Sequence, residues 1–211
     1  MADRVEHGHR PILPINRLEA FSDGVFAIAI TLLVLELALP AGSEANLLAA
    51  FLGAWPAYLA YIVSFSTIGA AWLGHATITS YMEHVDPLFV RLNLLLLLAV
   101  SFIPFPTKLV GEHIHEPDAE RVAVTILGIN LLLAALIIDG MWRYAVRSNL
   151  VRALADDEEM VAVSRRLDPG ILGYVAFIAI GIIFPIPAVL GYFAIAIGLL
   201  LPPVGLPRRR R

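Results

Sequence analysis

Polar and ionisable side chains lie inside long apolar stretches of this sequence, where burial in lipid costs free energy. The first apolar stretch holds the densest set, namely Arg17, Glu19, Ser22, Asp23, Thr31 and Glu36. The later stretches hold Trp72, His75, Asn93, Asn130 and Asp139. Residues of this kind are candidates for catalysis, metal binding, proton transfer or ion conduction.

Catalysis and metal binding are the first two chemistries to weigh. Ser22, Asp23 and His75 are a nucleophile, a carboxylate and an imidazole by type. Neighbouring Ser and Asp residues on a helix point about 100° apart, so one His can hardly bridge them in a relay. Four other histidines form loop pairs without helical His or Glu partners, namely His7, His9, His113 and His115. We therefore predict neither an enzyme nor a metal site.

The composition places these polar residues in a membrane protein. The chain has 211 residues, of which 59% are hydrophobic and 16% are charged. A soluble domain has about 45–50% apolar and about 25% charged residues. The apolar residues fall in blocks of roughly 20, the length that crosses a hydrocarbon core. This pattern excludes a soluble enzyme, a disordered protein and a nucleic-acid-binding protein, and the absence of cysteine excludes disulfides.

Six apolar segments are predicted to span the membrane. They cover about residues 18–39, 46–79, 87–109, 121–141, 171–186 and 189–201. The second exceeds the bilayer thickness and contains Pro56, so we expect a kinked or tilted helix there. The run Leu94–Leu98 does not alternate in polarity, which favours helices over barrel strands. We therefore predict an all-α membrane protein with a six-helix domain at 17–206, an amino-terminal segment at 1–16 and a basic tail at 207–211.

Lysine and arginine define the expected orientation. With six spans both termini share one side, and that side carries thirteen of the 15 basic residues, whereas the other carries Lys108 and Arg121. Because positive loops stay in the cytoplasm, we expect a multi-pass protein of the cell membrane with both termini cytoplasmic. Asp23 and Glu36 within a long first segment favour a retained helix over a cleaved signal. The basic tail either fixes this topology or binds anionic lipid.

The first predicted helix has two distinct faces. A stripe of bulky apolar residues, within about 60° on a helical wheel, consists of Phe21, Ile28, Leu32 and Leu35. Thr31 lies about 60° from Ile28, whereas Asp23 points about 140° away from it. Periodicity alone favours ordinary packing for the stripe. Residue types alone favour a structural hydrogen-bond network of Asp23 with Arg17 and His75.

Three short motifs resemble one known family. The run from Arg17 to Asp23 reads RLEAFSD, which resembles the first-helix signature RxxxFSD of the transmembrane protein 175 family. Trp72 and His75 match the W-x-x-H of its second helix, and Asn93 is similar to its third-helix pattern. This family comprises the endolysosomal potassium channel and its prokaryotic relatives. Six spans in about 200 residues fit the prokaryotic single-repeat form.

The resemblance implies a homotetrameric, potassium-permeable cation channel whose first helices line a central pore. Matching positions imply an apolar constriction and gate at Ile28, Leu32 and Leu35, and a selectivity role for Thr31. The polar residues implied to clamp the pore helix to its neighbours are Arg17, Phe21, Ser22, Asp23, Trp72, His75 and Asn93. A ring of Glu36 carboxylates would attract cations at the outer mouth, although interfacial solvation explains that residue equally well. The expected partners are three further copies of the chain, the lipid bilayer and permeant K⁺, with no cofactor.

Two other functions stay open on the sequence alone. A proton-linked secondary transporter would use Asp23, His75 and Asp139, although inverted repeats are not evident. A non-conducting membrane scaffold would use the same helices without a pore. The sequence leaves open whether Na⁺ or H⁺ also permeates.

Overall fold

The computed structural model describes residues 14–39, 43–82, 84–113, 116–151 and 170–201. These residues form helices in the order α1 (Ile15–Leu35), a 3₁₀ turn (Ser43–Asn46), α2 (Leu47–Gly53), α3 (Trp55–Ser80), α4 (Pro87–Phe102), α5 (Pro104–His113), α6 (Pro117–Arg147), the helix Gly170–Gly181 and α8 (Pro185–Leu200). Over these ranges the only β pairing is an isolated bridge between Met82 and Val151. The predicted all-helical class is therefore confirmed. The basic tail and nearly all of the amino-terminal segment lie outside the described residues.

Within the described part of the chain, four helical stretches are long and apolar enough to cross a membrane. They are α1, α3, the consecutive pair α4 and α5, and α6. The helices Gly170–Gly181 and Pro185–Leu200 are shorter. At about 1.5 Å per residue they measure roughly 18 and 24 Å, against about 30 Å for a hydrocarbon core. The prediction of six complete spans therefore stays a prediction.

Proline sets the start of several helices, because a first-turn position needs no backbone N–H. Pro56 lies in the first turn of α3, and α2 ends just before it. The long second apolar segment is thus two helices. Pro87 begins α4, where the Asp86 carboxylate caps the helix by accepting a 2.8 Å hydrogen bond from the Phe89 amide. Pro104 likewise begins α5 after a break at Ile103.

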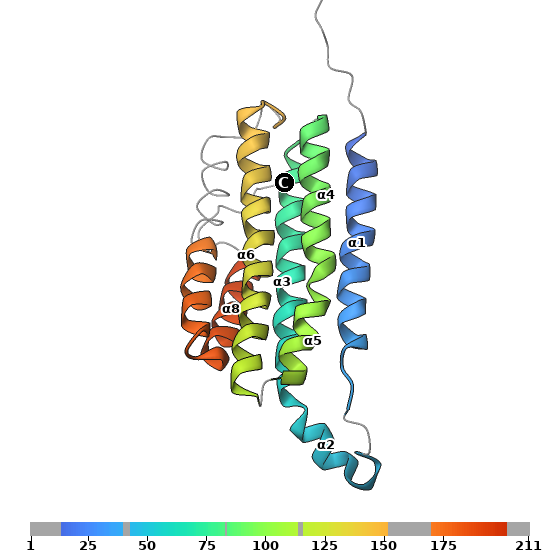
Figure 1. The fold of residues 1–211 in the computed structure, drawn as a ribbon. Helices are drawn as coiled ribbons and strands as arrows, with labels where there is room; N and C mark the ends of the chain where they lie inside the picture. The colour runs from blue at the N-terminus through green and yellow to red at the C-terminus, as the bar shows by residue number, and fades with distance from the viewer. Residues whose placement is uncertain (1–13, 40–42, 83, 114–115, 152–169, 202–211) are drawn as a thin grey trace, which may run out of the picture.

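The helices form an elongated bundle with α3 at its centre (Figure 1). The central helix packs against α1, α5, α6 and α8. By contrast, α1 runs along one edge of the bundle and contacts α3, α4 and α5. Its buried residues recur every three or four positions, namely Leu18, Ser22, Phe26, Ala29 and Leu33. Because this is one narrow face, most of the surface of α1 is left uncovered by its own subunit.

The hairpin of Gly170–Gly181 and α8 docks closely against the opposite side of the bundle. A Cβ atom at Gly128 of α6 would lie 2.1 Å from the Tyr192 hydroxyl oxygen, so only glycine fits there. Gly191 of α8 likewise lies against the Phe177 ring, where a Cβ atom would be 2.2 Å from the nearest ring carbon. The first close approach packs the hairpin on the long helix α6, and the second packs the two helices of the hairpin against each other.

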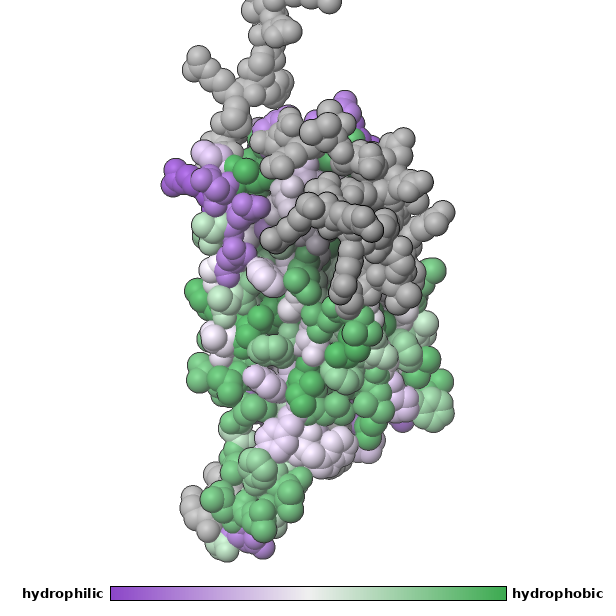
Figure 2. All heavy atoms as spheres, turned by 180° about the vertical axis from the view of Figure 1, so that it is seen from behind, coloured by the Kyte–Doolittle hydropathy of each residue, from purple (hydrophilic) through white to green (hydrophobic). Residues whose placement is uncertain are grey.

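The two ends of the bundle differ in their basic residues. At one end, α1 and α4 begin and α6 finishes, and this arginine end carries Arg17, Arg91, Arg143 and Arg147 (Figure 1). The opposite end, here the α2 end, carries Lys108 and Arg121. Figure 2 shows mainly apolar side chains on the length of the bundle between these ends and on α2 itself. The apolar band with charged ends is the surface expected of a membrane protein.

Candidate ion-conduction site

The apolar stripe of α1 does not pack into its own subunit. Ile28, Leu32 and Leu35 are 60%, 40% and 73% exposed, and Phe21 on the same stripe is exposed as well. Leu18, Phe26 and Leu33 occupy the face that does meet the bundle. Ordinary packing within the subunit therefore does not account for the stripe.

Thr31 is also exposed, beside this stripe. Its hydroxyl donates a 2.9 Å hydrogen bond to the carbonyl oxygen of Ile28, one turn earlier. A hydroxyl has one hydrogen and two lone pairs, so this bond occupies the hydrogen. The oxygen is left to act as an acceptor, which is the property needed to contact a cation.

A buried polar cluster joins α1, α3 and α4. The Asn93 side-chain amide donates to the Ser22 hydroxyl oxygen at 3.0 Å, and the Ser22 hydroxyl donates to the Leu18 carbonyl at 2.8 Å. The Asn93 carbonyl oxygen lies 2.9 Å from His75 Nε2. Because that oxygen can only accept, His75 carries a hydrogen on Nε2 in this arrangement. Three buried side chains on three helices thus satisfy one another, with the Phe26 ring against the imidazole at 5.7 Å.

A second, exposed bond joins α1 to α3. The Trp72 indole N–H donates to an Asp23 carboxylate oxygen at 2.8 Å. Asp23 lies on the flank of α1 that faces away from Ile28, about 140° round the helix. Ser22 and Asp23 therefore hold α1 through two separate bonds, one inside the subunit and one at its surface.

Arg17 and Phe21 do not join these bonds within the single chain. Both side chains are exposed near the start of α1, and neither has a hydrogen bond or ion pair to the residues that the structure describes. The structure thus brings together Ser22, His75 and Asn93, and separately Asp23 and Trp72. The side chains of Arg17 and Phe21 are exposed on the outside of the subunit.

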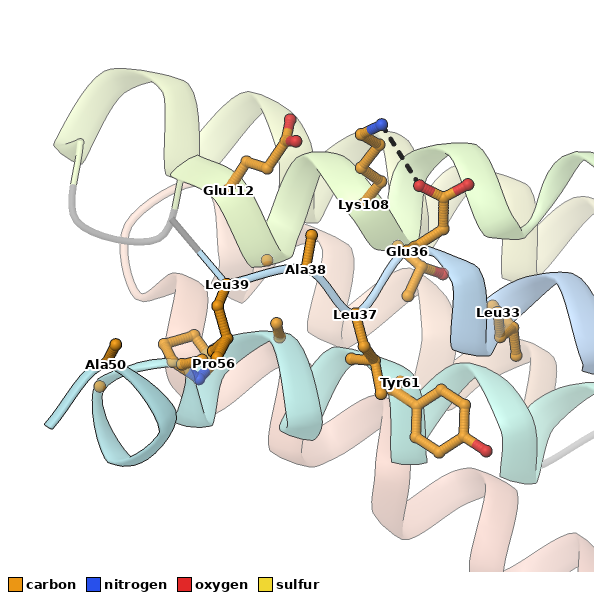
Figure 3. Close-up of a pocket in the computed structure, with 15 residues that line it drawn as sticks. Leu33, Glu36, Leu37, Ala38, Leu39, Ala50, Pro56, Tyr61, Lys108 and Glu112 are labelled. Atoms are coloured by element: carbon orange, nitrogen blue, oxygen red, sulfur yellow. Dashed lines mark ion pairs between the residues drawn. The ribbon is translucent and has the colours of Figure 1, made fainter. Parts of the chain in front are cut away.

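Glu36 caps the end of α1 at the α2 end. Its carboxylate lies 3.4 Å from the Lys108 ammonium of α5 (Figure 3). This ion pair was not foreseen, because the two residues are 72 positions apart and no local spacing signals their contact. The pairing reduces the negative charge that Glu36 presents to ions.

The ionisable residues of the transporter hypothesis occupy separate settings. Asp139, 8% exposed, pairs with Arg143 one turn later on α6 at 2.6 Å. Asp23 bonds Trp72 and His75 bonds Asn93. No bond among the described residues links these three ionisable groups into a relay. In the same ranges no group of three His, Asp or Glu side chains is placed to hold a metal ion.

Comparison with known proteins adds to this geometry. Residues 17–104 match the family described as the endosomal/lysosomal potassium channel TMEM175. A potassium channel of Chamaesiphon minutus is 40% identical over 162 residues, which cover 74% of this chain and 79% of that protein. A potassium channel of Streptomyces collinus is 40% identical over 161 residues, covering 75% and 78%.

The fold is similar to a solved structure as well. The crystal structure of a lysosomal potassium-selective channel TMEM175 homolog from Chamaesiphon minutus superposes with a TM-score of 0.80 at 35% identity. The match covers 88% of this chain and 96% of that one. The motif run, the bonds that its residues make and this match over nearly the whole length agree. The chain belongs to the TMEM175 family, which is a family of ion channels and not of enzymes.

Proposed function

We propose that this protein is a potassium-permeable cation channel formed by four copies around a central axis. The exposed apolar stripe on the edge helix α1 is the single observation that carries this proposal. The similar proteins of Chamaesiphon minutus and Streptomyces collinus, which bear the name potassium channel, support it. Conduction is passive, through a pore lined by α1 of each copy.

One edge helix cannot enclose a channel, so a pore lined by α1 needs several copies about a symmetry axis. In four copies, Ile28, Leu32 and Leu35 form three stacked apolar rings. A narrow apolar ring loses its water, and a cation does not enter a dry segment. These rings are therefore the proposed gate, and a small rotation or splaying of α1 opens it.

Thr31 supplies the proposed selectivity layer. In four copies, its hydroxyl oxygens form a ring of acceptors next to the apolar constriction. The internal bond to Ile28 keeps each hydroxyl hydrogen out of the ring. Four oxygens held in this way replace part of the hydration shell of a permeating ion.

The bonds of α1 to α3 and α4 serve as the proposed clamp. Ser22, His75 and Asn93 hold the pore helix from inside, and Asp23 with Trp72 holds it at the surface. Arg17 and Phe21, which face outward in the single chain, belong to the same clamp through contacts with a neighbouring copy.

The arginine end lies in the cytoplasm in this proposal, and six helices enter the membrane of the cell. The arrangement of the bundle supports the orientation, because Arg17, Arg91, Arg143 and Arg147 gather at one end. The short hairpin of Gly170–Gly181 and α8 is packed against α6 and supplies the fifth and sixth spans. The α2 end then faces outside.

A reconstitution experiment tests the function. Purified protein in liposomes is expected to carry K⁺ down its electrochemical gradient, with a smaller flux when Na⁺ replaces K⁺. The flux should rise in proportion to the gradient and need no proton gradient. Saturable flux that follows a proton gradient would favour a transporter, and electrically silent tetramers would favour a scaffold.

A further inference from the structure

A pocket of about 500 Å³ lies at the α2 end, beside the last residues of α1 (Figure 3). Its walls come from the end of α1 and from α2, α3 and α5. This volume is within the range of sites that hold small organic molecules. The residues assigned to the gate, to selectivity and to the clamp do not line it, so it is a separate feature of the subunit.

The pocket has one apolar side and one charged side. Leu37, Leu39 and Pro56 form the apolar side, with the Tyr61 ring among them (Figure 3). Along the other side run the charged groups of Glu36, Lys108 and Glu112. A molecule that fills this space must therefore be amphiphilic.

The charged side carries an excess of negative charge. Two carboxylates and one ammonium group line the pocket, and the ammonium of Lys108 is already paired with Glu36 at 3.4 Å. Glu112, one turn later on α5, has no ion pair within the described ranges. A bound cation beside Glu112 makes the net charge of the pocket lining zero, whereas a bound anion is repelled by its net negative charge.

We propose that this pocket binds an organic amine, with its ammonium group at the Glu112 carboxylate, beside the Lys108–Glu36 pair, and its apolar body against Leu37 and Tyr61. The arrangement of the charged row opposite the apolar wall carries this inference. Such molecules concentrate at a membrane surface, where the proposed orientation places the α2 end.

Occupancy of the pocket has a consequence for α1, and this step rests on the proposed channel function. Leu33 and Glu36 belong both to the pocket wall and to the end of the pore helix. A bound ammonium group competes with Lys108 for the Glu36 carboxylate. It thereby weakens the ion pair that joins α1 to α5, next to the proposed ring of four Leu35 side chains. The amine is therefore expected to change K⁺ flux.

The test uses 4-phenylbutylamine with a photoreactive diazirine on its ring, and the matching alcohol as a neutral control. On irradiation of the purified tetramer, we expect the amine to label peptides of α2, α3 and α5. Labelling should exceed that by the alcohol by about tenfold, because a bond to a charged partner is stronger than a neutral one. Glu112→Gln should remove this difference while leaving labelling by the alcohol unchanged.

Variants on α2 locate the site. Ala50 lines the pocket, so Ala50→Phe fills it and should abolish labelling. Leu48 is on the same helix, is 68% exposed and does not line the pocket, so Leu48→Phe is the matched control and should label normally.

Four results would overturn the proposal. These are labelling that survives Ala50→Phe, equal labelling by amine and alcohol, unchanged preference in Glu112→Gln, and no labelling because a neighbouring copy covers the pocket. Amine binding is read by labelling and conduction by flux. Normal labelling in a tetramer that carries no K⁺ would therefore contradict the proposed channel function and still support the amine site.

Discussion

At the scale of single residues, hydrogen bonds decide what each polar group of α1 can still do. The Thr31 hydroxyl donates its hydrogen bond to the Ile28 carbonyl, so its oxygen is left exposed as an acceptor. The Ser22 hydroxyl donates to the Leu18 carbonyl and accepts from the Asn93 amide, so both of its bonds lie inside the subunit. Two hydroxyls on one helix thus have different settings, because the oxygen of Thr31 is exposed and that of Ser22 is buried between helices.

Thr31→Val is expected to reduce the preference for K⁺ over Na⁺ several-fold, because valine keeps the shape and removes the acceptor ring. The measurement is the reversal potential under bi-ionic conditions. Thr77→Val is the matched control, since Thr77 is exposed and bonds the Leu73 carbonyl in the same way on α3. An unchanged reversal potential in Thr31→Val would remove this residue from selectivity.

The ion pair of Glu36 with Lys108 predicts opposite effects of two neutral substitutions. Lys108→Gln frees the carboxylate and should raise cation conductance, whereas Glu36→Gln should lower it. Both effects should be largest at low ionic strength, where charges are least screened, and should fade in concentrated salt. Single-channel recordings across a salt series measure them. Equal responses at low and high salt would dismiss an electrostatic role for Glu36.

At the scale of elements, α1 is held by one narrow packed face, by the bonds of Ser22 and Asp23 to neighbouring helices, and by the ion pair of Glu36 with Lys108 at its end. The buried cluster of Ser22, His75 and Asn93 ties it to α3 and α4, and the bond of Asp23 to Trp72 adds a second tie to α3. Asn93 is the centre of the buried cluster, because it bonds both other members. We therefore expect the position of α1 to depend most on this one amide.

Asn93→Ala should lower the stability of the assembled protein by about 2–4 kcal/mol, because it removes the buried partner of His75 and the donor to Ser22, which keeps only its bond to the Leu18 carbonyl. Thermal unfolding in detergent, followed by the loss of the tetramer peak in size-exclusion chromatography, measures the change. Ser101→Ala is the control, since Ser101 is exposed and bonds only its own helix. A tetramer as stable as the parent protein would contradict the clamp.

Part of this site could be predicted from the sequence. Local spacing reveals the stripe of Ile28, Leu32 and Leu35, because helical periodicity is a short-range property. The family resemblance also grouped Trp72 with Asp23 in one polar cluster, and the two side chains are bonded, whereas residue types alone favoured Asp23 with Arg17 and His75. The ion pair of Glu36 with Lys108 could not be predicted, because it depends on how α5 lies against α1 after the break at Ile103.

The helix boundaries show the same limit. The apolar segment 46–79 contains no Asp, Glu, Lys or Arg, so composition alone presents it as one element. The structure divides it at Ala54, where α2 ends and the first turn of α3 can accept Pro56 without losing a hydrogen bond. The proline was visible in the sequence, but the exact residue at which the chain turns depends on the packing of α3.

At the scale of the whole molecule, the exposed surface of α1 supports the proposed assembly of several copies. This edge helix exposes apolar and polar residues side by side, and neither lipid nor water suits such a mixed surface. Four chains of 23.0 kDa, or about 92 kDa, would enclose the stripes around an axis. Light scattering of the detergent-solubilised protein, corrected for detergent, measures the assembled mass.

Within that assembly, Ile28→Asn and Leu35→Ala should each raise basal K⁺ flux, because a wetter or wider ring no longer excludes water. Flux from proteoliposomes, normalised to the amount of tetramer, measures the effect. Leu95→Ala is the control, since Leu95 is an exposed leucine on α4, away from the proposed axis. Unchanged flux in both gate variants, with normal assembly, would count against the gate.

The single narrow seam that joins α1 to its bundle also bears on how the protein is made. In a single copy the side chains of Asp23 and Thr31 are exposed, although Asp23 is bonded to Trp72 of its own α3. In the proposed tetramer neighbouring copies cover these groups, so a copy without partners is expected to be the less stable form. We therefore expect biogenesis to favour encounters between chains translated from the same messenger, and unassembled copies to be cleared quickly.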